Sequence, residues 1–335
     1  MAVQIGTRHR LLSRLTVAVL VDKEVLTPGT SRFLKGEGDS PLVNSLRRLV
    51  ARVVVGPYTD AAGLLQWIEK VKPDVVFNLT EHVEGDRQKD SAICGLLDLL
   101  ELPYTGTGPR GLMLCRDKAL SKLIAAQEGF KIPKFFVVEK ASPRLPQGMT
   151  FPLVVKPRFD DASVGISQAS LVRTKEALLR RIAFLRQSET KKIICEEFIA
   201  GREMLVGVIE DRIMPVRELF IGRGSKSAPR LISYRLKHDR QYQRRWSFRT
   251  DFAQLTPEQE RRVKKLVLRT CCALDLRDYS RLDLMLTPTG EWVFLEANPN
   301  PGLYPFKRSR YGIWSDIDFD RLIERIMLRA LRRKP

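Results

Sequence analysis

The first third of the chain alternates short apolar runs with amphipathic segments. Three of the runs are typical of buried strands: residues 15–21, 52–55 and 75–79. Between the last two runs, Asp60 can cap a helix. The apolar residues of that helix recur on one face: Leu64, Leu65, Ile68 and Val71. A second helix is expected at 93–100 and a short strand at 103–104. Strands that alternate with helices in this way predict a parallel sheet with crossover helices.

The pattern changes after about residue 112, where strands fall closer together. A helix is predicted at 117–128 with Gly129 at its carboxyl end, and Thr174 can cap a later helix. Strands are expected at 151–156 and 163–167, on either side of a polar loop at 157–162. A third strand is expected after the second helix, at 193–199. The first two of these strands are expected to pair around the loop.

The last third combines strands with a long helix and a basic stretch. Thr256 and Gln259 form a capping box that opens the helix, with Pro257 in its first turn. Strands are expected before and after it: 204–209, 280–286 and 292–296. The segment from about 222 to 249 is rich in lysine and arginine and is expected to be a loop.

Charge is the one unusual bulk property of the chain. The net charge is +19, which favours anionic partners such as nucleotides, carboxylate or phosphorylated substrates, nucleic acid or a membrane surface. At 321–334, apolar residues repeat at helical spacing and arginines occupy the other face. We interpret this segment as a terminal helix docked on its own domain, although such a helix can also bind a membrane or RNA.

Several classes of protein are disfavoured by the sequence. No apolar run approaches the roughly 20 residues that a membrane helix needs. The first apolar run is followed by Asp22, Lys23 and Glu24 and by no small-residue cleavage site, so it predicts a strand in a cytoplasmic protein. The five cysteines and three histidines show no metal-ligand spacing, which argues against zinc and for buried, reduced thiols.

The strongest chemical pattern involves the last two predicted strands. Arg281 and Asp283 alternate on the first of them and therefore point to one face. Pairing with the next strand places Glu296 and Asn298 beside them. Two carboxylates and an amide oxygen are the hard ligands that Mg²⁺ takes next to nucleotide phosphates. An ordinary charged hairpin would not explain why these carboxylates lie in apolar strands.

Two lysines and an acidic segment are weaker signals when each is taken alone. Lys156 ends an apolar strand and Lys118 begins a helix, and lysine is a compact charge suited to phosphate oxygens. Glu196 follows an apolar strand whose edge is suited to an adenine ring, and Glu203 comes shortly after it. Each of these signals by itself also fits a solvated charge.

In this order and at these separations, the residues resemble the ATP-grasp fold and, most closely, the D-alanine–D-alanine ligases. The similarity runs from about residue 73 to 302. It is carried by GLLDLLELPYTG at 95–106, VKP at 155–157, SVGIS at 163–167, EEFIAGRE at 196–203 and EANPNPG at 296–302.

The resemblance implies an α/β fold, with α+β character in the C-terminal part. It divides the chain into a Rossmann-like parallel-sheet domain at 1–111, a small ATP-grasp subdomain at 112–195 and a C-terminal ATP-grasp subdomain at 196–335. The last unit carries the basic stretch at about 222–249 as a mobile loop over the site.

The resemblance also implies roles for individual residues. Phosphates, adenine and ribose of ATP would be contacted by one set: Lys118, Lys156, Ser163, Glu196, Phe198, Ile199 and Glu203. Two Mg²⁺ ions, or Mn²⁺ in their place, would be held by a second set: Asp283, Glu296 and Asn298. Arg281 and the backbone N–H of Gly302 would stabilise an oxyanion, and Lys237 would lie on the covering loop.

The amino-acid half of the pattern departs from the family. The turn after the first strand, at 20–25, lacks the family's glycines and serines. Ala162 stands where the family has a serine, and His238 stands where it has a tyrosine. After Gly302, residues 303–307 replace the small hydroxylated residues of the family. The changes favour another amino acid or a peptide at least as much as D-alanine.

The sequence thus predicts an ATP-dependent carboxylate–amine ligase that forms a peptide or amide bond through an acyl phosphate. Its substrates would be small amino acids or peptides, and the resemblance implies a homodimer. The alternative is a catalytically idle nucleotide-binding or RNA-binding relative that uses its basic surface, where Tyr242, Trp246 and Phe248 are interleaved with basic residues. Intact charged residues in the predicted site argue against a catalytically idle protein. The positive net charge does not exclude nucleic acid as a partner.

Overall fold

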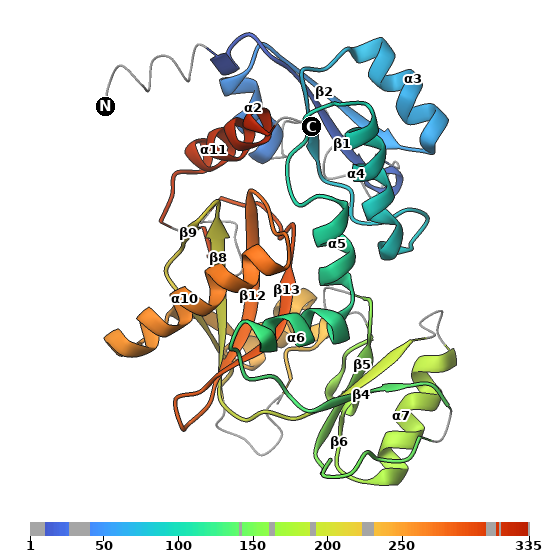
Figure 1. The fold of residues 1–335 in the computed structure, drawn as a ribbon, viewed down its shortest axis with the longest axis vertical. Coiled ribbons are helices and arrows are strands. Elements are labelled where there is room, and N and C mark those ends of the chain that lie inside the picture. The colour runs from blue at the N-terminus through green and yellow to red at the C-terminus, as the bar shows by residue number, and fades with distance from the viewer. Residues whose placement is uncertain are drawn as a thin grey trace.

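Three β-sheets, each covered by helices, build the structure, a computed structural model (Figure 1). It describes residues 11–26, 41–140, 143–160, 165–187, 192–222, 231–305, 313–314 and 316–333. Ser163, Ala162 and the side chain of His238 lie outside the described part of the chain.

The first sheet is parallel, as predicted. Its strands lie in the order β2-β1-β3: β2 (Arg52–Tyr58), β1 (Thr16–Asp22) and β3 (Val75–Asn78). The helices of this part are α2 (Pro41–Leu49), α3 (Ala61–Val71) and α4 (Asp90–Leu99), with 3-10 turns at Lys23–Leu26 and Arg87–Lys89. Asp60 caps α3 by accepting the Gly63 N–H at 2.8 Å, which confirms that prediction. The expected strand at 103–104 is reduced to one bridge between Tyr104 and Val76.

The second sheet is antiparallel. Its order is β4-β7-β5-β6: β4 (Phe135–Val138), β7 (Ile193–Glu197), β5 (Leu153–Pro157) and β6 (Leu171–Val172). Helix α7 (Lys175–Gln187) packs on it, and Thr174 accepts the Ala177 N–H at its start. The strand predicted at 163–167 is wrong for its described part, because Gly165 takes a φ of +67° that ends extended backbone. The partner of β5 is β6, reached through a 3-10 turn at Gln168–Ser170.

The third sheet is the largest. Its main path is β11-β10-β8-β12-β13, and β9 pairs with β8. The strands are β8 (Arg202–Ile209), β9 (Arg212–Ile213), β10 (Arg217–Phe220), β11 (Arg249–Phe252), β12 (Tyr279–Leu286) and β13 (Trp292–Asn298). The connecting helix α5 (Pro109–Arg116) leads to α6 (Lys118–Gln127), and α6 and α10 (Pro257–Ala273) cover one face. The predicted capping box of α10 is present, with N–H to side-chain distances of 3.2 Å and 3.0 Å between Thr256 and Gln259.

The basic stretch is not only a loop, because two short helices form within it: α8 (Tyr234–His238) and α9 (Arg240–Arg245). Asp239 supports the second helix by accepting the Tyr242 N–H at 2.9 Å.

All five cysteines are free, as expected, but Cys272 is exposed. It follows the buried Cys271 on α10, and successive helix residues point to different sides.

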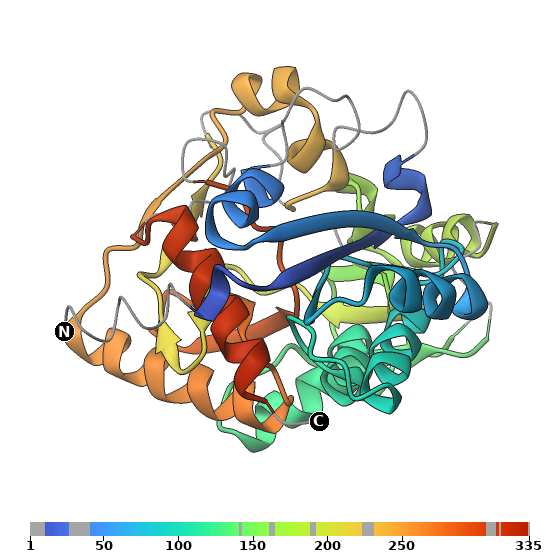
Figure 2. The same cartoon turned by 90° about the horizontal axis from the view of Figure 1, so that it is seen from above.

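The terminal helix α11 (Phe319–Arg332) docks on its own domain, as expected, and also on the N-terminal sheet, which the sequence did not predict (Figures 1 and 2). Its apolar face is fully buried: Leu322, Ile323, Ile326 and Met327. These side chains share a core with Val19 of β1 and Phe77 of β3, and Arg48 of α2 donates from Nε to Asp320 at 2.7 Å. Helical periodicity identifies a buried face but not its partner.

This docking removes the apolar face of α11 from contact with a membrane. Among helices in the described ranges, none is both long and apolar enough to cross a bilayer.

Ile326→Ala tests the docking of α11. Because Ile326 is 0% exposed, we expect the variant to lower the free energy of unfolding by about 2–5 kcal/mol. Urea unfolding followed by tryptophan fluorescence measures the loss. Leu268→Ala, on α10 and 37% exposed, serves as the control with a loss below about 1 kcal/mol. Equal losses for the two variants would contradict the docking.

Candidate active site

Four polar residues lie on one face of the third sheet, on paired strands. In the register of β12 and β13, Arg281 opposes Asn298 and Asp283 opposes Glu296. Directly opposed residues of an antiparallel pair point to the same face, so the side chains gather as their alternation predicts. Arg281 and Asp283 are buried, at 8% and 5% exposure.

Arg281 and Asp283 form a two-pronged ion pair. Nε of the guanidinium lies 2.5 Å from Oδ1, and Nη2 lies 2.9 Å from Oδ2. Burial raises the pKa of Asp283, and the arginine opposes that rise. Both carboxylate oxygens are therefore engaged, and a cation can reach them only if the guanidinium shares or releases them.

Glu296 is surrounded by positive charge. Burial alone would raise its pKa, but Lys118, Lys156, Lys237 and Arg281 lower it to about 2. The carboxylate is thus ionised at neutral pH, and the amide oxygen of Asn298 lies two residues further along β13. Within the described ranges, no group of three histidine, cysteine, aspartate or glutamate side chains is assembled for a metal. These residues fit a metal that also takes oxygens from a ligand such as a phosphate.

A buried cluster of lysine and glutamate joins the second and third sheets. The Glu196 carboxylate lies 2.8 Å from Lys122 Nζ and 2.9 Å from Lys156 Nζ. Lys122 also donates to the Leu295 carbonyl oxygen of β13 at 2.6 Å. The sequence interpretation missed Lys122, although its i+4 spacing from Lys118 places both lysines on one face of α6.

Both lysines of α6 are held away from water. Lys118 is 3% exposed and donates to the Asp160 carbonyl oxygen. Burial lowers the pKa of Lys118 and of Lys122 to about 8, although nearby glutamates oppose the shift. Because burial destabilises their charged form, an anion placed beside them would stabilise it, as a phosphate does.

The segment expected to hold adenine and ribose runs from β7 into β8. The Phe198 N–H donates to the Pro152 carbonyl oxygen at 3.1 Å, and Ile199 is half-buried. Glu203, on β8, has its pKa raised to about 7, first by burial and then by the charge of Asp283. The Glu196 carboxylate holds two lysines here, so its contact with adenine stays a prediction.

Lys237 and Gly302 lie at the border of the site. Lys237 belongs to α8 and is close enough to Glu203 and Asp283 for its charge to lower the pKa of each. A Cβ on Gly302 would lie 2.6 Å from the Tyr304 ring, so a side chain there would require this exposed ring to move. The Gly302 carbonyl oxygen accepts from Trp314 Nε1 at 3.3 Å, which fixes the backbone that follows β13.

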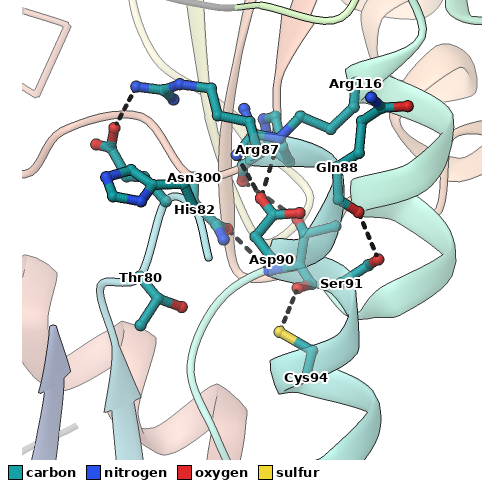
Figure 3. Close-up of polar contacts among 12 residues, drawn as sticks. Thr80, His82, Arg87, Gln88, Asp90, Ser91, Cys94, Arg116 and Asn300 are labelled. Carbon is teal, nitrogen blue, oxygen red and sulfur yellow. Dashed lines mark hydrogen bonds and ion pairs between the residues drawn. The ribbon is translucent and has the colours of Figure 1, made fainter. Parts of the chain in front are cut away.

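The N-terminal part of the chain meets the site through polar contacts (Figure 3). The Thr107 N–H donates to Asn300 Oδ1 at 2.9 Å, and Asn300 lies in the loop that follows β13. A Cβ on Gly106 would lie 2.7 Å from that same oxygen, so the two segments are in close contact. The ion pair between Asp90 and Arg116, at 2.5 Å, is buried beside them. These contacts were not indicated by the sequence.

The carboxyl end of β1 carries a second polar group. Asp22 accepts the Glu81 N–H at 3.1 Å and lies 3.6 Å from His82 Nε2, which is 4.0 Å from Glu24. Burial raises the pKa of Asp22 to about 6, and the backbone N–H of Glu81 opposes the shift. Ligands of open parallel sheets bind at this edge, which makes Glu24 and His82 candidates for substrate contact.

Comparison with known proteins identifies the family. The model of the D-ala D-ala ligase C-terminus matches residues 124–328. This chain belongs to the D-alanine–D-alanine ligase family. The family match confirms the resemblance drawn from the residues, and the ATP-grasp fold with it.

Individual members of the family agree in sequence and fold. The D-alanine–D-alanine ligase of Aquifex aeolicus is 28% identical over 265 residues, 77% of this chain and 83% of that protein. The crystal structure of the Bacillus anthracis D-alanine–D-alanine ligase with ATP has a TM-score of 0.71 at 20% identity, covering 96% of this chain and 98% of that one. The VanG D-Ala:D-Ser ligase of Enterococcus faecalis has a TM-score of 0.65 at 19% identity, covering 95% and 100%.

Lys122→Met tests the buried charge cluster. The variant leaves Glu196 with one lysine and the Leu295 carbonyl oxygen without its donor, so we expect a loss of about 3–5 kcal/mol in the free energy of unfolding. Lys264→Met is the matched control, because its ion pair with Glu260, at 2.6 Å, is exposed and contributes below about 1 kcal/mol. Urea titration measures both, and similar losses would refute the importance of burial.

Proposed function

We propose that this protein is an ATP-dependent carboxylate–amine ligase that works through an acyl phosphate. The observation that carries the proposal is the row of Arg281, Asp283, Glu296 and Asn298 facing the buried lysines of α6 and β5. A site with carboxylates and an amide oxygen beside several lysines suits the phosphates and metal of a nucleotide.

In the proposed reaction, a substrate carboxylate attacks the γ-phosphate of ATP, and the acyl phosphate and ADP form. An amine then attacks the acyl carbon, and phosphate leaves. Lys118 and Lys156 would bind the phosphates, and Lys237 would help to close the site against water that hydrolyses the intermediate. Arg281 and the Gly302 N–H would stabilise the oxyanion formed when the amine attacks.

A divalent metal would be held by Asp283, Glu296 and Asn298, and would neutralise charge on the transferred phosphoryl group. Arg281 has two tasks in this scheme, because its guanidinium now occupies both oxygens of Asp283. We infer that nucleotide binding exchanges this ion pair for contacts to the ligand, which releases Asp283 for the metal and Arg281 for the substrate.

The amine substrate is not fixed by the fold. A D-Ala:D-Ser ligase shares the fold with D-alanine–D-alanine ligases, so the pocket's side chains decide the choice. In this chain, Tyr304 packs against Gly302 and is 52% exposed, where the family resemblance leads us to expect small hydroxylated residues. This supports a substrate other than D-alanine at least as well as D-alanine.

The aromatic residues of the basic stretch do not favour the RNA-binding alternative. Arg235 lies 4.5 Å from the centre of the Tyr242 ring, and Arg245 lies 5.3 Å from that of Trp246. Trp246 is also 9% exposed. Rings covered by their own arginines, or buried, offer little surface for stacking on bases.

Release of ADP and phosphate tests the ligase. We expect the full chain with ATP and Mg²⁺ to turn over when one carboxylate–amine pair is supplied from a panel of amino acids and small peptides that includes D-alanine. Glu296→Gln should lower this rate about 100-fold or more, because it removes a charge proposed to act on the phosphates. Glu291→Gln is the control, since Glu291 lies in the turn of the same hairpin, half-buried and away from the site.

Two results would contradict the ligase. One is unchanged turnover in Glu296→Gln, which would separate the reaction from the proposed site. The other is tight ATP binding with no stimulation by any member of the panel, which would favour the idle nucleotide-binding relative.

The pH dependence of adenosine binding tests the role of Glu203. Its pKa of about 7 means that a proton occupies the carboxyl at lower pH and reduces its capacity to accept ribose hydroxyls. Calorimetry without Mg²⁺ should therefore show affinity that rises from about pH 6 to about pH 8. Glu203→Gln should bind equally at both pH values, and an equal slope in the two proteins would reject this role.

A further inference from the structure

Arg217 is a buried arginine without a use in the reaction described so far. Its side chain lies on β10 and is 5% exposed. Nε and Nη1 of its guanidinium are buried and have no hydrogen-bond partner among the residues that the structure describes. A buried cation with unpaired donors is costly, and proteins keep such groups where a ligand completes them.

Arg217 lies in the same row of the sheet as Asp283 and Glu296, two of the three proposed metal ligands. The row runs across five strands, from β11 to β13: Phe252, Arg217, Leu205, Asp283 and Glu296. Directly paired residues point to one face, so Arg217 emerges on the face that carries the candidate active site. Two strand spacings separate it from Asp283, about 10 Å.

The surroundings of Arg217 hold the side chain without neutralising it. Its guanidinium carbon lies 4.1 Å from the centre of the Phe252 ring, which fixes its position. Asp251 and Asp316 are the carboxylates whose charge acts on it, yet neither forms an ion pair with it in the described part of the chain. The Phe252 ring therefore holds the guanidinium in position, while Nε and Nη1 have no hydrogen-bond partner among the described residues.

The wall between Arg217 and the reacting centre is apolar. Leu205 separates it from Asp283 within the row, and Leu303 belongs to the same core cluster as Leu205. Leu303 directly follows Gly302, which we propose to stabilise the oxyanion. A substrate that contacts both Arg217 and Gly302 thus needs an anionic group at one end, a reacting group at the other and a short spacer between them.

We propose that Arg217 binds an anionic group of the amine substrate, at the end remote from the bond that forms. The inference rests on the proposed ligase, and it narrows the substrate class to amino acids or peptides with an additional carboxylate or a phosphate. A charge-assisted hydrogen bond from a desolvated guanidinium would select these over neutral amines of similar size.

Paired probes that differ in one anionic group test the proposal. Calorimetry in the presence of Mg²⁺ and a non-hydrolysable ATP analogue compares aspartate with alanine, and phosphoserine with serine, in both D and L forms. We expect wild type to bind one anionic probe about 10- to 100-fold more tightly than its neutral partner. Arg217→Met should abolish that preference and leave the neutral partner's affinity unchanged, and Arg217→Lys should keep part of it.

The chain offers a control in Arg249, an exposed arginine in the same strand pair. It lies 4.7 Å from the ring of Phe220, its direct partner across β10 and β11, as Arg217 lies over Phe252. Phe220 lies three positions after Arg217 along β10, an odd offset, so the second pair projects from the opposite face of the sheet. Arg249→Met removes the same charge from the same strand pair and should leave the preference intact.

The outcomes separate this inference from the ligase. Equal binding of anionic and neutral probes by wild type would overturn the role of Arg217, whatever the turnover. An equal loss for both members of a probe pair in Arg217→Met and Arg217→Lys would make the residue structural only, and would also overturn it. Binding of an anionic probe that depends on Arg217, without ADP release for any pair, would keep the anion site and refute the ligase.

Discussion

The buried cluster of Glu196 with Lys122 and Lys156 is the interaction on which the rest of the site depends. It joins α6 to β7 and β5 of the second sheet, and through the Leu295 carbonyl oxygen to β13 of the third. Removing such charges from water is expensive, and the cost is offset only while every partner is in place. The two sheets are thus held at one separation, and Lys118 is presented between them on the same helix face.

This arrangement leaves the site with charges that await a ligand. Burial destabilises the ammonium of Lys118, while Glu296 stays ionised because lysines and Arg281 surround it. Arg281 meanwhile neutralises Asp283. A nucleotide with its metal brings both signs of charge at once, and could complete each of these groups without moving the strands that carry them.

Local pattern predicted much of the fold, because each of its signals depends on a few neighbouring residues. Asp60, Thr174 and Thr256 cap the helices that they were expected to open. The features that the local pattern did not predict are decided by the tertiary structure. Gly165 turns the chain where a strand was expected, and α11 buries its apolar face against the N-terminal sheet as well as against its own domain.

The sequence by itself determined the pairing of Arg281 and Asp283 with Asn298 and Glu296, since alternation on two strands joined by a short turn leaves few other registers. It also carried the family resemblance. Only the tertiary structure decided that Lys122 completes the charge cluster, that Asn300 ties the site to Thr107, and that Arg217 faces it from two strands away. These contacts join residues far apart in the chain, and their energies come from burial, which no local pattern encodes.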